Sequence, residues 1–595
     1  MNIPRIPLAA ILALALAGSL SAAPGQQIVI TNPAEGMVQI PGMPPRPLKS
    51  GTGRISGRVL SAETGAPLRR AQVRILGPDV GAKAAMTDAE GRYEFRELPA
   101  GRFNLTASKS GYVMVQYGQT RPFEAGRPIE LADKQVVEKA DISMPRGSVI
   151  SGRIVDEFGE PVADAMVSAM RQSWMGGRRR FVPAGRTAQT NDLGQFRMYG
   201  LPPGEYYVSA SLRNSDTMMF EMLGQQGGPT GSNPGSGYAP TYFPGTTSPS
   251  DAQKISLAVG QEAQGTEFAL IAVKLARISG LVMNAEGKPV SGAMVRASPA
   301  GRGGDIAAMI MGGTGGRTSP DGTFTLNNVA PGEYSLDVRA VQITRSDGGE
   351  VETIRGMGGD SEFASLPVTV AGDDLTNVTI VTSKGATATG RITFEGGSKP
   401  ASLAGIRVTA MPAEMSEGPM MGGAGASVKA DGTFELKGLV GRRLLRVGNL
   451  PDGWMLKAIR LDGNDITDTG ADFKAGHDVP ALEIVATPRT TEIAGGVTSS
   501  TGTAVKDYTV IVFSDNPEHW ALPLSRWVAG ARPDQEGRFK FRNMPPGSYY
   551  AVAVDYVEQG AWGDPDLLDR LKGAAKRFTL GEGGAETLEL DITQG

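Results

Sequence analysis

The chain has no cysteine and only two histidines among its 595 residues. The missing thiols exclude disulfide bonds, a cysteine nucleophile and a lipid anchor on an N-terminal cysteine. Each domain must therefore be stabilised by its own apolar core. Basic and acidic residues nearly balance, at 59 and 62, so the net charge of −3 gives no attraction toward nucleic acid.

Long apolar runs are also scarce, and the clearest one lies at the N-terminus. Residues 8–20 are almost purely Ala, Leu and Ile, follow Arg5, and precede the small residues Ser21, Ala22 and Ala23. This pattern predicts a secretory signal peptide over residues 1–23, followed by a flexible Pro/Gly linker over residues 24–51. We expect an exported protein that is periplasmic, cell-surface or secreted, with no membrane span after cleavage. An uncleaved membrane anchor is the alternative.

What the chain has in quantity is glycine (81) and proline (40), without long helical patterns. That composition predicts many short strands joined by turns. A first motif recurs five times, with a shared glycine, as ISGRV, ISGRI, ISGLV, ATGRI and IAGGV around Gly57, Gly152, Gly280, Gly390 and Gly495. These intervals are the size of whole domains rather than of solenoid units.

Two further motifs follow each copy of the first. One is a Gly-x-Pro turn before alternating apolar residues, as in GEPVADAMVSA from Gly159, and it predicts a half-buried strand. The other is a turn, a strand, a Pro-Gly turn and a strand, as in TNDLGQFRMYGLPPGEYYVSA from Thr190. Its aspartate or asparagine is expected to bond its own backbone. Tyr206, Tyr334 and Tyr549 lie two residues after the turn glycine and resemble tyrosine corners, whereas the fourth copy has Arg443 there.

We therefore predict an all-β protein of five tandem antiparallel β-sandwich domains, Ig-like or transthyretin-like. The expected bounds are 52–147 (repeat one), 148–275 (repeat two, with long loops), 276–385 (repeat three), 386–490 (repeat four) and 491–595 (repeat five). The linkers are only a few residues long, so neighbouring domains should nearly touch, and we expect a bending rod of roughly 160 Å.

The three motifs in this order resemble the carboxypeptidase regulatory-like domain over about residues 52–595. The resemblance implies a prealbumin-type sandwich, grouped with carbohydrate-binding-like folds, and it is specific for fold rather than function. The family takes its name from an accessory domain of zinc carboxypeptidases. Neither His477 nor His519 begins the HxxE pair that such an enzyme needs, and no GxSxG elbow or phosphate loop is present. We therefore expect no enzymatic activity, no cofactor and no metal site.

Aromatic residues are few, and some cluster in loops where they could bind a ligand. Repeat five has His519, Trp520 and Trp527 in a loop over residues 515–533, and exposed indole faces would stack on sugars. The alternative is that both tryptophans are buried as a small core. Repeat two contributes a second group of candidate binding residues, which are Trp174, Tyr238, Tyr242 and Phe243. The alternative is that these residues pin their loop to its own sandwich.

Other charged or sulfur-rich segments are interpreted as ordinary surface. The run Arg178–Arg180 is expected to be a solvated face. The Met-rich segments, and the group Asp462, Asp465, Asp468 and Asp472, are expected to be loops rather than copper or calcium sites.

The leading functional hypothesis is an exported non-catalytic protein that binds carbohydrate or another cell-envelope component, with protein partners possible. The alternative is a structural spacer or scaffold at the cell surface without a small ligand. A hydrolase that uses a carboxylate pair is the third hypothesis.

Overall fold

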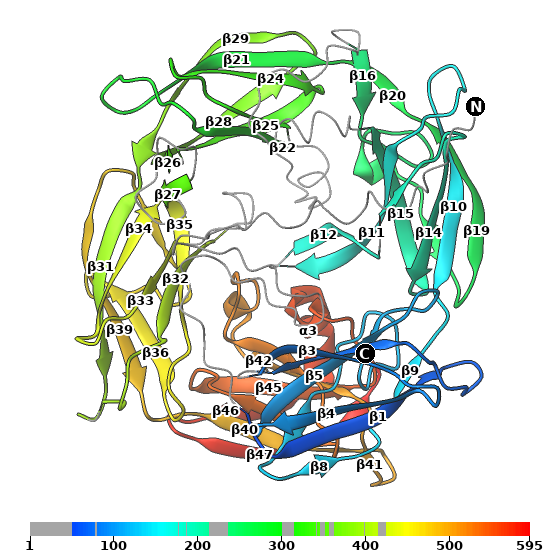
Figure 1. Ribbon diagram of the computed structural model, residues 1–595. Helices are drawn as coiled ribbons and strands as arrows, with labels where there is room; N and C mark the ends of the chain where they lie inside the picture. The colour runs from blue at the N-terminus through cyan, green and yellow to red at the C-terminus, as the bar shows by residue number, and fades with distance from the viewer. Residues whose placement is uncertain are drawn as a thin grey trace, which may run out of the picture.

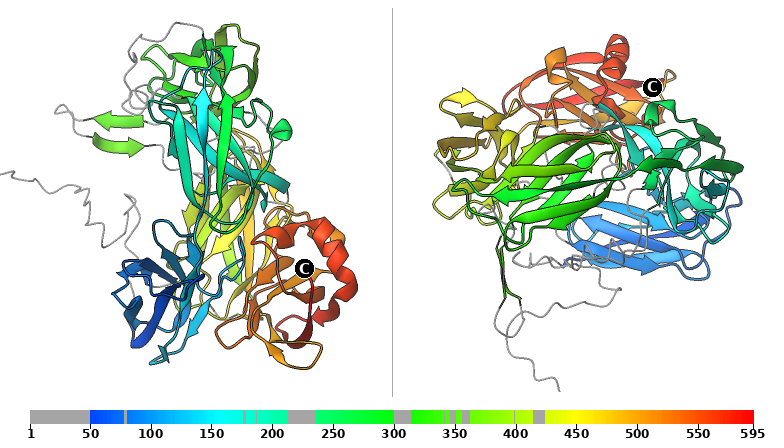
Figure 2. Two further views of the ribbon diagram at one scale, coloured as in Figure 1. Left: turned by 90° about the vertical axis from the view of Figure 1, so that its right-hand side faces the viewer. Right: turned by 90° about the horizontal axis from the view of Figure 1, so that it is seen from above.

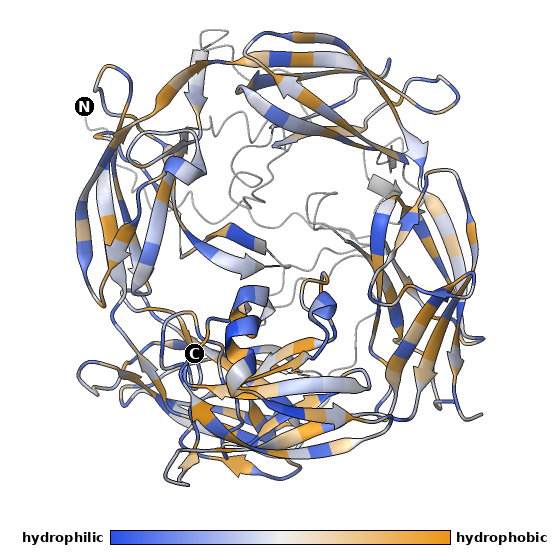
Figure 3. Cartoon of the chain, turned by 180° about the vertical axis from the view of Figure 1, so that it is seen from behind, coloured by the Kyte–Doolittle hydropathy of each residue, from blue (hydrophilic) through white to orange (hydrophobic). Residues whose placement is uncertain are grey.

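The computed structural model describes residues 50–77, 80–175, 178–185, 187–212, 236–299, 314–340, 342–345, 351–355, 362–397, 399–413 and 424–595. The predicted Met-rich segments around Met218, Met309 and Met420 lie outside these residues, except for Met411, which is in strand β32 and is 38% exposed. Short strands dominate, and they build separate sheets in the first four repeats and one connected sheet in repeat five, which confirms the all-β class and the tandem sandwiches. Orange and blue residues alternate along many strands in Figure 3, as expected where one face of a sheet packs on a core.

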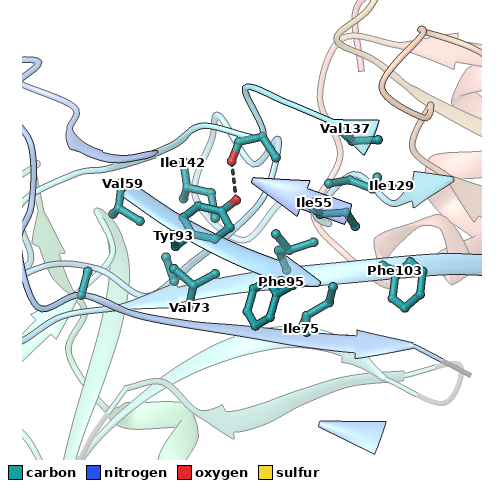
Figure 4. Close-up of a cluster of buried hydrophobic side chains, with 14 of the residues drawn as sticks. Ile55, Val59, Val73, Ile75, Tyr93, Phe95, Phe103, Ile129, Val137 and Ile142 are labelled. Atoms are coloured by element: carbon teal, nitrogen blue, oxygen red, sulfur yellow. Dashed lines mark hydrogen bonds between the residues drawn. The ribbon is translucent and has the colours of Figure 1, made fainter. Parts of the chain in front are cut away.

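Repeat one shows the common plan. One sheet has the order β4-β1-β8 with β9 beside β1, and the other has the order β3-β2-β5-β6 with β7 beside β5. Its strands are β1 (Gly53–Ser61), β2 (Gln72–Gly77), β3 (Gly81–Met86), β4 (Arg92–Leu98), β5 (Gly101–Ser108), β6 (Val115–Gln116), β7 (Ile129–Leu131), β8 (Val136–Val137) and β9 (Ile142–Met144). Figure 4 shows the buried aromatic and aliphatic side chains that fill the space between the two sheets.

Repeat two keeps this plan and adds a long hairpin, β11–β12, and a second pair, β16–β20. Its elements are β10 (Ser148–Val155), β11 (Ala165–Met175), β12 (Arg178–Pro183), β13 (Ala188–Gln189), β14 (Gln195–Leu201), β15 (Gly204–Leu212), β16 (Ser236–Ala239), β17 (Thr241–Tyr242), η1 (Pro249–Asp251), β18 (Ile255–Leu257), β19 (Glu262–Ala269) and β20 (Ile271–Lys274).

Repeats three and four are built in the same way. Repeat three contains β21 (Ala276–Met283), β22 (Met294–Pro299), β23 (Thr314–Arg317), β24 (Thr323–Val329), β25 (Gly332–Arg339), β26 (Gln342–Arg345), β27 (Val351–Arg355), β28 (Glu362–Val370), β29 (Leu375–Val381) and β30 (Ser383–Lys384). Repeat four contains β31 (Ala386–Phe394), β32 (Arg407–Pro412), β33 (Ala424–Ser427), β34 (Thr433–Leu439), β35 (Gly441–Gly448), β36 (Met455–Leu461), β37 (Asn464–Asp465), β38 (Ala471–Phe473) and β39 (Val479–Thr487).

Repeat five joins its strands into one continuous sheet. It also has short helices, which the sequence pattern did not predict. Its elements are β40 (Glu492–Thr498), β41 (Ala504–Val505), β42 (Thr509–Ser514), η2 (Pro517–His519), β43 (Val528–Ala531), β44 (Phe539–Arg542), β45 (Gly547–Val554), η3 (Ala561–Gly563), α3 (Pro565–Leu571), η4 (Lys572–Ala574), β46 (Lys576–Leu580) and β47 (Ala585–Thr593). The signal for α3 is present in the sequence, because Asp564 caps the helix and Pro565 begins it.

The glycine of the first motif and the aromatic residue of the third motif face each other across one strand pair in every repeat. The pairs are Gly57 with Tyr93, Gly152 with Phe196, Gly280 with Phe324, Gly390 with Phe434, and Gly495 with Phe539. A Cβ at Gly280 would lie 1.8 Å from the carbonyl oxygen of Val378, on the parallel strand at its other side. The glycine therefore makes room for both the aromatic ring and the returning strand.

The turn chemistry also agrees with the prediction. The carboxylate of Asp88 accepts from the backbone amides of Glu90 and Arg92. The hydroxyls of Tyr206, Tyr334 and Tyr549 donate to the carbonyl four residues earlier, at 2.6, 2.9 and 2.6 Å, which confirms the tyrosine corners. In repeat four the guanidinium of Arg443 takes this role and donates to the carbonyl of Val440 at 2.6 Å.

The predicted extended rod is wrong. The five repeats follow one turn of a ring, called here the domain ring, with repeats two, three and four around its circumference (Figure 1). Repeat one (blue) and repeat five (orange to red) lie side by side where the turn closes (Figure 2). The ring closes because repeat one is bonded to repeat five by contacts between residues about 400 positions apart in the chain.

Candidate functional site

Trp520 belongs to a second core of repeat five. Strand β42 is buried along its whole length, because the 515–533 loop and α3 cover the face that the sandwich leaves open. Trp520 is 5% exposed, and its indole N–H donates to the carbonyl of Ser514 at 2.7 Å. The expected exposed indole face is therefore absent. The unbroken apolar run Val510–Phe513 is the signal for a strand buried on both faces.

Trp527 is half-buried, and its ring is stacked with two other aromatic rings. The ring of His519 lies 4.2 Å away at 21°, and that of Tyr549 lies 6.1 Å away at 22°. Nδ1 of His519 lies 3.0 Å from the hydroxyl oxygen of Ser514. These contacts hold the loop against its own sandwich. Because Trp520 is buried, the two tryptophans do not form one exposed stacking platform, whereas Trp527 is half-buried.

The polar edge of Trp527 joins repeat five to repeat four. Its indole N–H donates to Asp468 at 3.0 Å, and Arg526 donates to both oxygens of the same carboxylate at 2.8 and 2.9 Å. Burial raises the pKa of Asp468, but the hydrogen bonds and charge of Arg526 outweigh burial and leave the pKa below its usual range. Burial lowers the pKa of the neighbouring Arg446. Asp468 is thus an ion-pair partner of Arg526.

Trp174 and Arg179 lie against repeat five rather than in a loop of repeat two. The hairpin β11–β12 reaches inside the domain ring, where Trp174 packs on the glycines of the η3 turn, Gly560 and Gly563. Arg179 lies 3.5 Å from the carboxylate of Asp564, and Arg180 is only 9% exposed. The prediction that Arg178–Arg180 forms a solvated face is therefore wrong for Arg180.

The remaining predicted aromatic residues serve repeat two itself. Tyr242 is 4% exposed and packs with Met170. Phe243 lies edge to face against Phe268 with ring centres 6.0 Å apart. Tyr238 donates to Glu157 at 2.9 Å. These side chains pin the loop to its own sandwich, and they do not form one site with the aromatic residues of repeat five.

Sequence reasoning missed the contact that closes the domain ring. It is made by five consecutive residues of repeat one, Thr120–Glu124, called here the clasp segment. Each of them is bonded to repeat five: Thr120 to Asp507 at 3.0 Å, Arg121 to Asp555 at 3.1 Å, the Pro122 carbonyl to the Tyr556 hydroxyl at 2.9 Å, the Phe123 carbonyl to the Gln559 amide at 2.9 Å, and Glu124 to Arg532.

The centre of the clasp is a buried ion pair. The side chains of Glu124 and Arg532 are each 1% exposed. Arg532 also donates to Asp507 at 2.6 Å and to the carbonyl of Gly118 at 2.9 Å. Beside it, Phe123 has a left-handed backbone, with φ of 59°, and its ring lies 3.8 Å beneath the guanidinium of Arg171 of repeat two. No local signal in a loop identifies such residues, because only the opposing domain buries them.

An open groove on repeat four is large enough for a ligand. It has a volume of about 680 Å³ and lies on the sheet β34-β31-β39 of repeat four. Its walls carry both charge signs and hydroxyl groups, from residues that include Arg391, Lys429, Glu435, Glu483 and Thr389. A volume of this size falls within the range of small-molecule sites, which is about 300–1,000 Å³. A smaller groove of about 450 Å³ lies between repeats one and five.

Within the described ranges, no group of three or more His, Asp or Glu residues is arranged to hold a metal ion. In the same part of the chain, no helix has both the length and the apolar character needed to cross a membrane.

Comparison with solved structures finds β-sandwich proteins at low similarity. A streptococcal ancillary pilin is 14% identical, covering 56% of this chain and 98% of its own, with a TM-score of 0.19. The major pilin subunit of Bacillus cereus is 12% identical, over 56% of this chain and 99% of its own, with a TM-score of 0.14. Two B repeat units of the collagen-binding protein of Staphylococcus aureus are 11% identical, over 73% and 99%, with a TM-score of 0.12. Values this low support no conclusion about function.

No curated protein matches the chain in sequence. The family model of the carboxypeptidase regulatory-like domain matches residues 54–144, 149–230 and 277–383. These matches fall on the first three copies of the motifs, which contain three of the five glycine and aromatic pairs and the corner residues Tyr206 and Tyr334. The first three repeats of this chain belong to the carboxypeptidase regulatory-like domain family.

Proposed function

We propose that this protein is an exported, non-catalytic scaffold whose working form is the closed domain ring. The observation that supports this proposal is the clasp, in which five consecutive residues of repeat one are bonded to repeat five. A simple spacer needs only its linkers, and a buried ion pair between its ends would serve no purpose. Taking Glu124 and Arg532 out of water is costly, so the pair restricts how the two ends can meet.

Small-angle scattering of the mature chain tests the ring. Five domains in an extended row of roughly 160 Å would have a radius of gyration of about 46 Å, because the radius of a thin rod is its length divided by √12. The domain ring requires a value well below that and a distance distribution without a long tail. Mass spectrometry of the protein recovered outside the cytoplasm would test export, through an N-terminus near residue 24.

A second candidate function, carbohydrate binding, is favoured by the groove of repeat four. Guanidinium and ammonium groups donate hydrogen bonds, and carboxylates accept them, so its walls offer both partners to sugar hydroxyls. The groove has no stacking platform among its lining residues except the buried Phe434, and it would therefore recognise a glycan by polar contacts.

A glycan array followed by titration tests this second candidate. Arg391→Ala should weaken binding of any glycan found by about tenfold, which corresponds to about 1.4 kcal/mol. Arg153→Ala is the matched control, because Arg153 holds the same motif position in repeat two, outside the groove. Equal losses from the two substitutions, or no glycan at all, would remove the groove as a carbohydrate site.

A further inference from the structure

The face of repeat five that receives the clasp segment is a docking surface made entirely by its own fold. Its bonding groups come from strand ends and turns of repeat five, namely Asp507, Arg532, Asp555, Tyr556 and Gln559. Repeat one adds a backbone contact beside the clasp, where Gln535 accepts from the amide of Glu130 at 3.1 Å and donates to its carbonyl at 2.9 Å. None of these bonds requires the two faces to belong to the same chain.

The polar character of this interface suits specific docking. Two of its five clasp bonds use backbone carbonyls, and the others use charged or hydroxyl side chains. An unmatched charge at the buried Glu124–Arg532 position would be strongly unfavourable, so the face selects a clasp segment that carries an acid there. A second copy of this chain carries that segment by definition.

The contact between repeats one and five can separate if the links between the other repeats bend. Repeat three is tied to repeat two by an exposed ion pair, in which the side chains of Lys274 and Asp373 are 67% and 85% exposed. Such pairs contribute under about 1 kcal/mol, so the link between repeats two and three can bend at little cost. Short linkers hold the two docking faces of one chain at a high effective concentration, which favours closure within the chain at low protein concentration.

We propose that repeat five is a receptor for the clasp segment of a second copy of this chain, so that two opened rings exchange their clasps reciprocally. The exchange uses the contacts of the closed monomer and creates no new interface, as in domain swapping. This inference rests on the proposed ring, and it adds a partner and the surface that the partner occupies.

Charge reversal at the buried pair tests the exchange. Glu124→Arg places two arginines at the closure of one chain, and Arg532→Glu places two glutamates there beside Asp507, so neither variant should close on itself. In an equimolar mixture, the arginine introduced into the clasp segment of the first variant can pair with the glutamate introduced on repeat five of the second. The unaltered Glu124 of the second variant can pair with the unaltered Arg532 of the first. Light scattering after size exclusion should then show the mass of a heterodimer in the mixture and of a monomer for each variant alone.

The double variant E124R/R532E is the matched control, because it restores opposite charges within one chain and should remain a closed monomer. A mixture that stays monomeric while both variants keep the β-sheet circular dichroism of the wild type would overturn the exchange. If either variant fails to fold, the exchange is tested instead with wild-type chain refolded at about 1 mM. That concentration is near the effective concentration of the two faces within one chain, which is about 1 mM for short linkers. A dimer there supports exchange, and monomer alone overturns it.

Scattering of the wild type separates this inference from the one on which it rests. An extended wild-type chain would defeat both the ring and the exchange. A closed wild-type ring with no assembly in the mixture would defeat the exchange alone.

Discussion

At the residue scale, the recurring motifs are explained by a few packing requirements repeated in each sandwich. The first motif needs glycine because a Cβ would collide with a backbone carbonyl, at 1.9 Å for Gly152 and 1.8 Å for Gly495. The third motif begins with a buried threonine in the first three repeats. In repeat one, the hydroxyl of Thr87 donates to the carbonyl of Leu68 at 2.6 Å and accepts from the amide of Ala71 at 2.8 Å. These contacts join the second motif to the third.

The corner tyrosine of repeat three gives a prediction at this scale. Tyr334 is 7% exposed, and its hydroxyl is bonded to the carbonyl of Ala330. We expect Tyr334→Ala to destabilise repeat three by about 3–5 kcal/mol, as for other large buried aromatic residues. Tyr334→Phe should cost only the hydrogen bond, about 0.5–1.5 kcal/mol. Denaturant unfolding of the full chain measures both.

Repeat one provides a natural precedent for the milder change, because Phe103 occupies the corner position there without a hydroxyl and is fully buried. If Tyr334→Ala and Tyr334→Phe destabilised the chain equally, the side chain would contribute through its hydroxyl alone and the packing role would be wrong.

At the element scale, the 515–533 loop and α3 convert a sandwich sheet into one that is buried on both faces. Trp520, Leu568 and Leu571 share that second core with Phe513 of β42. The loop then uses Arg526 and Trp527 to hold the carboxylate of Asp468 in repeat four. Aromatic residues that looked suited to a ligand therefore support the junction between two domains.

Acid should weaken this junction. The pKa of Asp468 is lower in the folded chain than its unfolded value of about 3.9, so the carboxylate contributes stability at pH values above about 4. That contribution is lost as the pH falls through the lower folded pKa. We expect Asp468→Asn to reduce the melting temperature at pH 7 and the difference from wild type to shrink toward pH 2.

Melting curves recorded from pH 7 to pH 2 measure this effect. Asp472→Asn is the matched control, because Asp472 is an exposed aspartate four residues away. A constant difference between Asp468→Asn and wild type across the whole pH range would contradict the assignment of the ion pair.

At the scale of the whole molecule, the closure between repeats one and five decides the shape. The clasp places a buried ion pair at its centre and exposed pairs at its edge, such as Arg121 with Asp555, whose side chains are 47% and 39% exposed. Because surface pairs contribute little and a broken buried pair leaves a desolvated charge, the centre should dominate the free energy of closure.

Two truncations compare the centre of the clasp with its edge. Glu124→Ala leaves Arg532 buried with Asp507 as its remaining acidic partner, and we expect it to weaken closure by about 3 kcal/mol and to raise the radius of gyration. Arg121→Ala removes an exposed pair and should change closure by less than about 1 kcal/mol. Scattering and sedimentation velocity on both variants measure the shape. The reverse order of effects would show that the buried pair does not hold the ring.

The sequence alone determined the sandwich fold and the chemistry of its turns, because these depend on contacts between residues close in the chain. The spacing of Gly280 and Phe324, the Asp and Gly turns, and Tyr334 after its Pro-Gly pair all act within one repeat. Only the tertiary structure decided which loop residues are buried, as with Trp520 under α3 and Trp174 against η3. It also decided the shape, because the partner of Glu124 is Arg532, 408 residues away. A loop residue in the sequence carries no mark of the domain that will cover it, since burial between domains depends on how every intervening linker turns.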